Sequence, residues 1–561
     1  MFRSHFLLLW LWIIVGTCLR FIHLAALPPW TDESATMVFS LGNSFYDVPL
    51  NKFIDLPTLI EPLRLNDNAG INDVTELLLT ESTHPPLFFI LTHLWLMLFP
   101  GVDGLVSLWA ARSLSALLGV AAIPAIFYFA KLAFASQTVA QIAAALMAVS
   151  PFGIFIAVQA RHYTAVVLLV IASVSCFMVV FRSLARGGTI PLWLGLTWIS
   201  VNCLGVATHY FFILTLAAIA IAFVPLLWQY RQNPKILLRP QWRRLYVIAF
   251  GSFIGCLVWL PSLLAVSDSS PTDWIYQSNA LEKWLEPLGR FVLWLMSSVV
   301  LLPSSLYDFS LGIVIVSGLL TLLFWFVYLP LIIEGLKLQQ HPAGREAVTA
   351  LGTYLIAAIA LFFLFTYLGL DLTLAGRFQF VYFPLVIVLT AAGLSHLWSG
   401  RNSPSLAIGL SKYRNGKKTL AIFLTISLIS GLVANLNSGY LQNHRPDLAI
   451  EKIIQGSTAP IAIAINYRHH GDTGRAIGLA WGLKDLPQIN SPLFYLAERN
   501  GDRNLDSATI LSRELTRIKR PLDLWLLNFR DEVKLSQDCI LDSDYRGTAG
   551  QYKYRLYHCR D

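Results

Sequence analysis

Two adjacent carboxylates, Asp32 and Glu33, follow the first long apolar stretch of a chain in which only 13% of residues are charged. Ionised carboxylates are costly to remove from water, and they are rare where lipid surrounds a protein. At a membrane surface, after Pro28, Pro29 and Trp30, such a pair is a candidate catalytic base or a candidate ligand of a divalent cation. The structural alternative is a helix start, because acids favour the first turn.

Further polar side chains interrupt the apolar stretches at widely separated positions. Arginine and histidine can stabilise a phosphate that gains negative charge as it leaves, and a carboxylate can take a proton from an acceptor hydroxyl. Together these groups suit group transfer from a lipid phosphate. Each also has an ordinary interpretation as an interfacial anchor, a snorkelling charge or the start of a helix. The candidates for substrate binding are His84, Arg161, His162, Tyr163, His209, Tyr210 and Arg377.

A divalent metal ion is a second possibility for the acidic group. Carboxylate and imidazole side chains could hold such an ion against a phosphate. The candidate ligands are Asp32, Glu33 and His84. Their types do not decide whether a metal takes part, and the sequence indicates no other cofactor.

The elements that must position these residues are transmembrane helices. The chain has 561 residues and is 56% hydrophobic, whereas soluble proteins carry roughly 25% charged residues. The sequence therefore predicts a polytopic α-helical membrane protein. Two apolar stretches, 86–100 and 287–303, are short. Eleven others approach the length of about 20 residues that a crossing needs, namely 5–27, 106–130, 137–157, 163–183, 190–208, 209–229, 245–266, 309–334, 346–368, 378–398 and 418–438.

The charge distribution predicts the orientation. Basic residues gather at Lys131, at Arg182 and in segment 231–244, whereas segment 28–83 carries nine acids against two basic residues. By the positive-inside rule the acidic loop lies outside, and the basic segments lie inside only if 86–100 does not cross fully. We therefore expect a cytoplasmic N-terminus. The compact loops and the lack of a eukaryote-type retention signal favour a bacterial plasma (inner) membrane. All the candidate residues then lie on the outer side.

The last part of the chain changes character. Residues 1–439, including the outer loop 28–84, form the predicted transmembrane domain, and the polar segment 440–561 predicts a small extracytoplasmic α/β domain. Short strands are expected at 461–465 and 524–527 and a helix at 506–519. A disulfide between Cys539 and Cys559 is plausible in an oxidising compartment. Aromatic residues do not interleave with the basic stretches, so we expect no nucleic-acid partner.

Five motifs occur in an order and spacing that resemble a known family. The chain resembles GT-C fold glycosyltransferases of the family 39 type, which include protein O-mannosyltransferases and the lipid A aminoarabinose transferase. The resemblance covers roughly residues 1–400. The motifs are Pro29-Trp30-Thr31-Asp32-Glu33-Ser34, Thr83-His84-Pro85-Pro86-Leu87-Phe88-Phe89, Ala160-Arg161-His162-Tyr163, Thr208-His209-Tyr210-Phe211 and Gly376-Arg377-Phe378.

The resemblance implies a polyprenyl-phosphate-linked sugar as donor, hexosyl or pentosyl transfer, and inversion at the sugar carbon. Asp32 matches the family's catalytic carboxylate and Glu33 its acidic neighbour. Arg161 and Arg377 match basic positions expected near the lipid phosphate. The related oligosaccharyltransferases carry metal-binding acids after the position of Arg161, where this chain has segment 164–166, Thr-Ala-Val. The acceptor, whether protein, lipid or glycan, is not indicated.

Two other classes of function stay open. A transporter or flippase of lipid-linked glycans would place charges near the bilayer midplane or along a path through it. A non-enzymatic envelope protein would bind glycan or a partner through its outer domain, for example with Tyr467, Trp481 and Tyr495. Such aromatic residues are also ordinary core residues.

Overall fold

The computed structural model describes residues 2–232, 234–267, 273–276, 282–303, 309–398, 415–436, 442, 444–486, 491–498, 507–529, 533, 535 and 537–560. The chain divides into two units. The helical unit comprises residues 1–22, 113–267 and 272–440, and the α/β unit comprises residues 23–112, 268–271 and 441–561. The predicted boundary at residue 439 lies outside the described residues. Segment 23–112, expected to be part of the transmembrane domain, instead belongs mainly with the C-terminal region.

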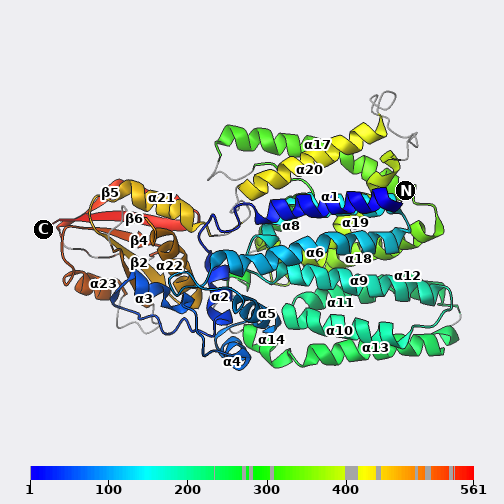
Figure 1. The fold of residues 1–561 in the computed structure, drawn as a ribbon, viewed down its shortest axis with the longest axis horizontal. Coiled ribbons are helices and arrows are strands. Elements are labelled where there is room, and N and C mark those ends of the chain that lie inside the picture. The colour runs from blue at the N-terminus through cyan, green and yellow to red at the C-terminus, as the bar shows by residue number, and fades with distance from the viewer. Residues whose placement is uncertain are drawn as a thin grey trace. The chain divides into compact units, whose positions relative to one another are not determined.

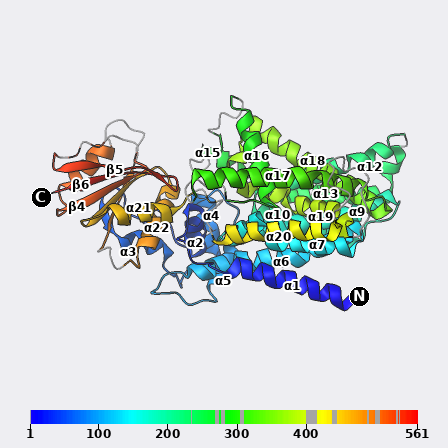
Figure 2. The same ribbon diagram turned by 90° about the horizontal axis from the view of Figure 1, so that it is seen from above.

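Long apolar helices run side by side in the helical unit (Figures 1 and 2), with α10 against α13 and α11 against α18. The first residues of helix α6, up to Arg112, are assigned to the α/β unit, and the rest of the helix belongs to the helical unit. The described helices are α1 (Phe2–Phe21), α6 (Leu108–Phe134), α7 (Gln137–Val149), α8 (Pro151–Ala157), α9 (Tyr163–Ala185), α10 (Leu192–Thr208), α11 (Phe212–Ala222), α12 (Val224–Gln229), α13 (Pro240–Leu257), α14 (Leu260–Ser267), α15 (Asp273–Tyr276), α16 (Leu285–Ser297), α17 (Leu311–Lys337), α18 (Pro342–Tyr367), α19 (Phe383–Trp398) and α20 (Gly416–Leu436), with short 3₁₀ helices at η2 (Pro234–Leu238), η4 (Leu372–Leu374) and η5 (Gly376–Val381).

The helices confirm a multi-pass membrane protein. Among the described residues, six helical segments are long and apolar enough to cross a bilayer, and the bent pair of α7 and α8 raises this to seven. Several other predicted crossings correspond to shorter apolar helices, namely α1, α10 and α19. The predicted crossing at 245–266 is divided between α13 and α14. The short stretch 287–303 contributes α16, which has 13 residues.

A buried arginine stabilises the break between α7 and α8, which are bent by 54°. Arg20 of α1 is 0% exposed and donates to the carbonyl oxygens of Met147 and Ala148, both at 2.9 Å. The last carbonyls of a helix lack partners within it, and they carry partial negative charge. The guanidinium therefore satisfies the end of α7 immediately before the chain turns.

The α/β unit is built on a six-stranded sheet with the order β1-β3-β2-β4-β6-β5. Strand β2 pairs in parallel with β3 and β4, and the other pairings are antiparallel. The strands are β1 (Phe53–Asp55), β2 (Ile461–Tyr467), β3 (Leu493–Glu498), β4 (Leu522–Leu527), β5 (Cys539–Ala549) and β6 (Tyr552–Cys559). The described helices are α2 (Thr31–Ser40), α3 (Leu56–Ile60), α4 (Ile71–Glu81), α5 (Leu87–Leu96), α21 (Pro446–Gly456), α22 (His470–Leu483) and α23 (Ser507–Leu515), with the 3₁₀ helix η1 (Glu61–Leu63).

The burial of β2 and β4 agrees with their central position in the sheet. All six residues of β4 and the first six of β2 are buried, as expected of central parallel strands covered on both faces. These two strands confirm the predicted strands at 461–465 and 524–527. Strand β1 comes from the acidic loop and pairs with β3, which ties that loop to the C-terminal region. Helix α5 has 10 residues and so spans about 15 Å, half of the hydrocarbon core.

A disulfide and a charged triad join the last strands. Cys539 and Cys559 form a disulfide across β5 and β6. Beside it, His558 Nδ1 lies 2.6 Å from Asp523 Oδ1, and its Nε2 lies 3.1 Å from Asp542 Oδ2. Partial burial of the ring favours its neutral form, but the hydrogen bonds to Asp523 and Asp542 outweigh this effect and raise the pKa of His558.

This triad predicts a pH-dependent stability. Since the pKa of His558 is raised above the ordinary value of 6.5 on folding, its stabilisation is complete below pH 6.5 and is lost as pH rises through the folded-state pKa. We expect the thermal unfolding midpoint of the full chain in detergent to fall over this window. His558→Gln should abolish that dependence, while His341→Gln, a substitution of an exposed histidine, should preserve it. An identical pH dependence in wild type and His558→Gln would contradict the assignment.

Candidate active site

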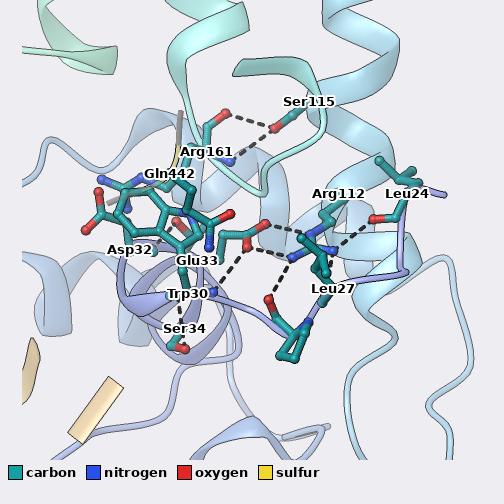
Figure 3. Close-up of polar contacts among 12 residues, drawn as sticks. Leu24, Leu27, Trp30, Asp32, Glu33, Ser34, Arg112, Ser115, Arg161 and Gln442 are labelled. Atoms are coloured by element: carbon teal, nitrogen blue, oxygen red, sulfur yellow. Dashed lines mark hydrogen bonds and ion pairs between the residues drawn. The ribbon is translucent and has the colours of Figure 1, made fainter. Parts of the chain in front are cut away.

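The first group of candidate residues lies at the N-terminus of α2 in the α/β unit. Glu33 is 0% exposed, and its Oε1 and Oε2 accept from Nε and Nη2 of Arg112, both at 2.7 Å. Its Oε2 also accepts from the backbone N–H of Trp30 at 3.3 Å. Figure 3 shows this paired contact. Bidentate pairs of this kind fix geometry as well as charge.

Arg112 also holds the backbone that leads into α2. Its Nη1 donates to the carbonyl oxygens of Leu24 and Leu27 at 2.9 and 3.0 Å, and its Nη2 donates to that of Pro28 at 3.3 Å. Figure 3 shows Arg112 between Glu33 and the segment of Leu24 and Leu27. One guanidinium thus anchors both the approach to the helix and its first turn.

Asp32 differs from its neighbour. Successive side chains of a helix point about 100° apart, so Asp32 leaves the helix in another direction than Glu33, and it is half-buried where Glu33 is fully buried. The first turn of a helix also stabilises negative charge. Of the two carboxylates, Asp32 is therefore the one with access for proton transfer, whereas Glu33 is engaged in the ion pair.

The candidate metal ligands do not form a cluster. Over the described ranges of the chain, no group of three or more His, Cys, Asp or Glu side chains has a geometry that could hold a metal ion. His84 instead contacts the hydroxyl of Ser82 through Nδ1 at 3.3 Å and packs on Phe89 with ring centroids 5.9 Å apart. Both oxygens of Glu33 are occupied by Arg112.

The second group lies in the helical unit, where three short connections meet. Arg161 is 1% exposed, and its backbone is fixed by Ser115, which donates to its carbonyl at 2.8 Å and accepts from its N–H at 3.2 Å (Figure 3). The guanidinium carbon lies 5.7 Å from the ring centroid of Tyr163. The ring of His162 lies 4.8 Å from that of His209. The sequence-predicted residues on α9 and after α10 are thus neighbours.

Arg377 belongs to the same group. Its guanidinium carbon lies over the rings of Trp274 and Phe378, at 5.1 and 5.6 Å from their centroids, and these two rings are parallel within 7°. Phe378 and Phe380 in turn contact His209 at 6.1 and 4.9 Å between centroids. The guanidinium is therefore within cation–π distance of two aromatic rings.

A second ion pair holds the turn before Arg377. The carboxylate of Asp371 is 0% exposed, accepts from Arg290 Nη2 at 2.7 Å, and accepts from the N–H and hydroxyl of Thr373 at 3.0 and 2.6 Å. Arg290 Nε donates to the same hydroxyl at 3.0 Å. This network fixes η4, the 3₁₀ helix just before η5.

His209 is neutral in this surrounding. Burial, and then the positive charges of Arg161 and Arg377, lower its pKa from 6.5 to about 3. Its Nδ1 accepts from the N–H of Phe211 at 3.1 Å, so Nε2 carries the proton at neutral pH. His209 can therefore donate one hydrogen bond, while the arginines supply the charge. Tyr210 packs toward Trp259, with centroids 6.3 Å apart.

Sequence reasoning missed several residues that organise these groups. Arg112 had a usable signal, since it is a lone charge at the end of an apolar stretch. Asp371 had a similar signal as an acid next to apolar helices. Trp274 had none, because its role depends on a contact with a residue 103 positions away.

Three comparisons with known proteins complete the description. No model of a protein family matches the chain, and no curated protein sequence matches it. Among solved structures, it is similar to ArnT from Cupriavidus metallidurans bound to undecaprenyl phosphate, with 12% identity and a TM-score of 0.49 over 98% of this chain and 97% of that one.

It is also similar to the archaeal oligosaccharyltransferase AglB from Archaeoglobus fulgidus in complex with an inhibitory peptide and a dolichol-phosphate, with 12% identity and a TM-score of 0.47. That match covers 85% of this chain and 64% of the archaeal one. The roles of residues rest on this chain's own contacts.

Proposed function

We propose that the protein is an integral-membrane glycosyltransferase that moves a sugar from a polyprenyl-phosphate donor to an extracytoplasmic acceptor. The observation that carries this proposal is the cluster of Arg161, His209 and Arg377, linked through the rings of Tyr163 and Phe378. Two guanidiniums and one imidazole form a suitable recognition group for a phosphate. Apolar helices surround the cluster, as a donor with a lipid tail requires.

The chemical step follows from these roles. Asp32 takes the proton of the acceptor hydroxyl while that oxygen forms a bond to the anomeric carbon of the sugar. The bond between the anomeric carbon and the phosphate oxygen breaks, and its electron pair leaves with the polyprenyl phosphate. Arg161 and Arg377 stabilise the added negative charge. Attack from the face opposite the phosphate inverts the anomeric configuration.

We also propose the orientation expected from the charges. The N-terminus is cytoplasmic, the membrane is the plasma (inner) membrane, and the α/β unit is extracytoplasmic. The Cys539–Cys559 disulfide supports this orientation, because structural disulfides persist in oxidising compartments and are rare in the cytosol.

A transfer assay tests the proposal. Purified protein in detergent receives a panel of radiolabelled polyprenyl-phosphate sugars and an envelope extract as the source of acceptor. We expect label transfer by wild type and by Arg231→Ala, the matched control, since Arg231 is exposed and also stacks on a tryptophan, Trp228, at 4.6 Å. Arg377→Ala should lower kcat/KM by about 10²-fold or more, in the range of a lost charge-stabilising donor. Equal transfer by all three proteins would contradict the assigned role.

The stacking of Trp274 on Arg377 gives a finer prediction. Loss of a cation–π contact worth about 0.5–2 kcal/mol should raise the KM for the donor by about 2- to 30-fold. We therefore expect Trp274→Ala to show this increase with little change in kcat, and Trp274→Phe to keep most of the affinity. Michaelis kinetics with varied donor distinguishes the effects. An unchanged KM in Trp274→Ala would show that the ring does not hold Arg377 for donor binding.

A further inference from the structure

One face of α22 in the α/β unit lacks side chains. Gly474, Gly478 and Gly482 follow one another at intervals of four residues and so lie on the same face of the helix. A glycine in a helix interior costs roughly 1 kcal/mol relative to alanine. Three of them in a helix of 14 residues need a compensating contact.

The segment that leads to Asp32 lies on this face. A Cβ atom at Gly478 would lie 2.5 Å from the carbonyl oxygen of Pro29, and one at Gly474 would lie 3.2 Å from that of Thr31. A Cβ at Gly482 would lie 2.9 Å from Cγ of Pro28. The backbone at Pro29 and Thr31 therefore lies directly on the helix, and at Gly478 the distance to Pro29 leaves no room for a Cβ atom.

Hydrogen bonds fix both sides of Asp32 to the C-terminal region. Before it, the hydroxyl oxygen of Thr31 lies 3.2 Å from Nδ1 of His444. After it, Ser34 Oγ donates to the carbonyl oxygen of Gly474 at 3.3 Å. Arg112 holds the carbonyl of Pro28. Asp32 therefore sits in a segment that is clamped between Arg112 and α22.

We propose that Gly474 and Gly478 are positioning residues for the transfer reaction, because they set the location of the Asp32 carboxylate. This inference rests on the proposed function. It gives the C-terminal region a part in the chemical step. A misplacement of about 1 Å is enough to lower a rate by about 10²-fold.

Gly478→Ala tests the inference, because its methyl group must displace Pro29 or the helix. We expect kcat for sugar transfer to fall about 10²-fold, with the KM for the donor and the unfolding midpoint within about twofold and a few degrees of wild type. Gly474→Ala, with the less severe 3.2 Å contact, should give a smaller fall in kcat. This variant also serves as the test if Gly478→Ala does not fold. Gly352→Ala in α18 is the matched control, since nothing lies within 4 Å of its added Cβ.

The split between kcat and KM separates positioning from general damage. If both variants are folded and keep wild-type kcat, or if kcat falls only in proportion to the loss of folded protein, the inference is overturned. Absence of transfer by wild type with every donor is a different result, since it overturns the proposed function itself.

Discussion

Asp32→Asn is expected to lower the rate of sugar transfer by about 10²–10⁴-fold. Asparagine keeps the shape of the side chain but cannot accept the proton of the attacking hydroxyl, and general-base catalysis contributes about 10²–10⁴-fold to rate. We expect kcat to fall by that factor while the KM for the donor changes little, because the arginines that bind phosphate are intact. Radiolabel transfer under saturating donor measures the effect.

The control for this variant is another acid of the same unit. Asp67 is exposed, so Asp67→Asn removes only a surface charge. We expect this variant to retain wild-type transfer activity. The Asn variant should also match wild type in yield and unfolding midpoint. Full activity of Asp32→Asn would remove Asp32 from the mechanism.

Arg112→Leu is expected to destabilise the protein by about 3–5 kcal/mol, the cost of leaving a buried charge without its partner. The carboxylate of Glu33 is 0% exposed, and Arg112 also satisfies three backbone carbonyls. Neutral leucine fills part of the volume but donates no hydrogen bond. Thermal unfolding of the purified protein in detergent measures the loss.

Two comparisons identify the cause of that loss. Arg64→Leu disrupts an exposed ion pair with Glu61 and should cost no more than about 1 kcal/mol. Glu33→Leu combined with Arg112→Leu should recover part of the loss, because no charge is then left buried, although the three carbonyls still lack their donor. If Arg112→Leu is as stable as Arg64→Leu, the pair does not organise the start of α2.

The sequence predicted the general architecture because hydrophobic length and periodicity are local signals. The apolar stretches, the buried strands β2 and β4 and the short α5 follow from composition and pattern. The membership of segment 23–112 in the α/β unit was not predicted. It includes the pairing of β1 with β3, in which Phe53 pairs with Tyr495, 442 positions away, and Ile54 with Phe494, 440 positions away. No local pattern in the sequence reports such a pairing.

The roles of the candidate site residues stay predictions. In the structure, contacts link Arg161, His162, Tyr163, His209 and Arg377. The expectation that Glu33 is a catalytic or metal-binding residue stays a prediction, and the sequence did not indicate its buried pairing with Arg112. Adjacent acids look equivalent in a sequence, and only the fold shows that Glu33 pairs with a residue 79 positions away.

The most direct measurement follows the lipid product of a single turnover. An excess of protein is mixed with a labelled polyprenyl-phosphate sugar and an acceptor in liposomes. The assay also determines which leaflet of the bilayer holds each labelled lipid. We expect free polyprenyl phosphate to be released in an amount equal to that of the sugar that reaches the acceptor. Movement of the intact sugar-linked lipid between leaflets, without release of polyprenyl phosphate, would contradict it and assign the protein to lipid transport.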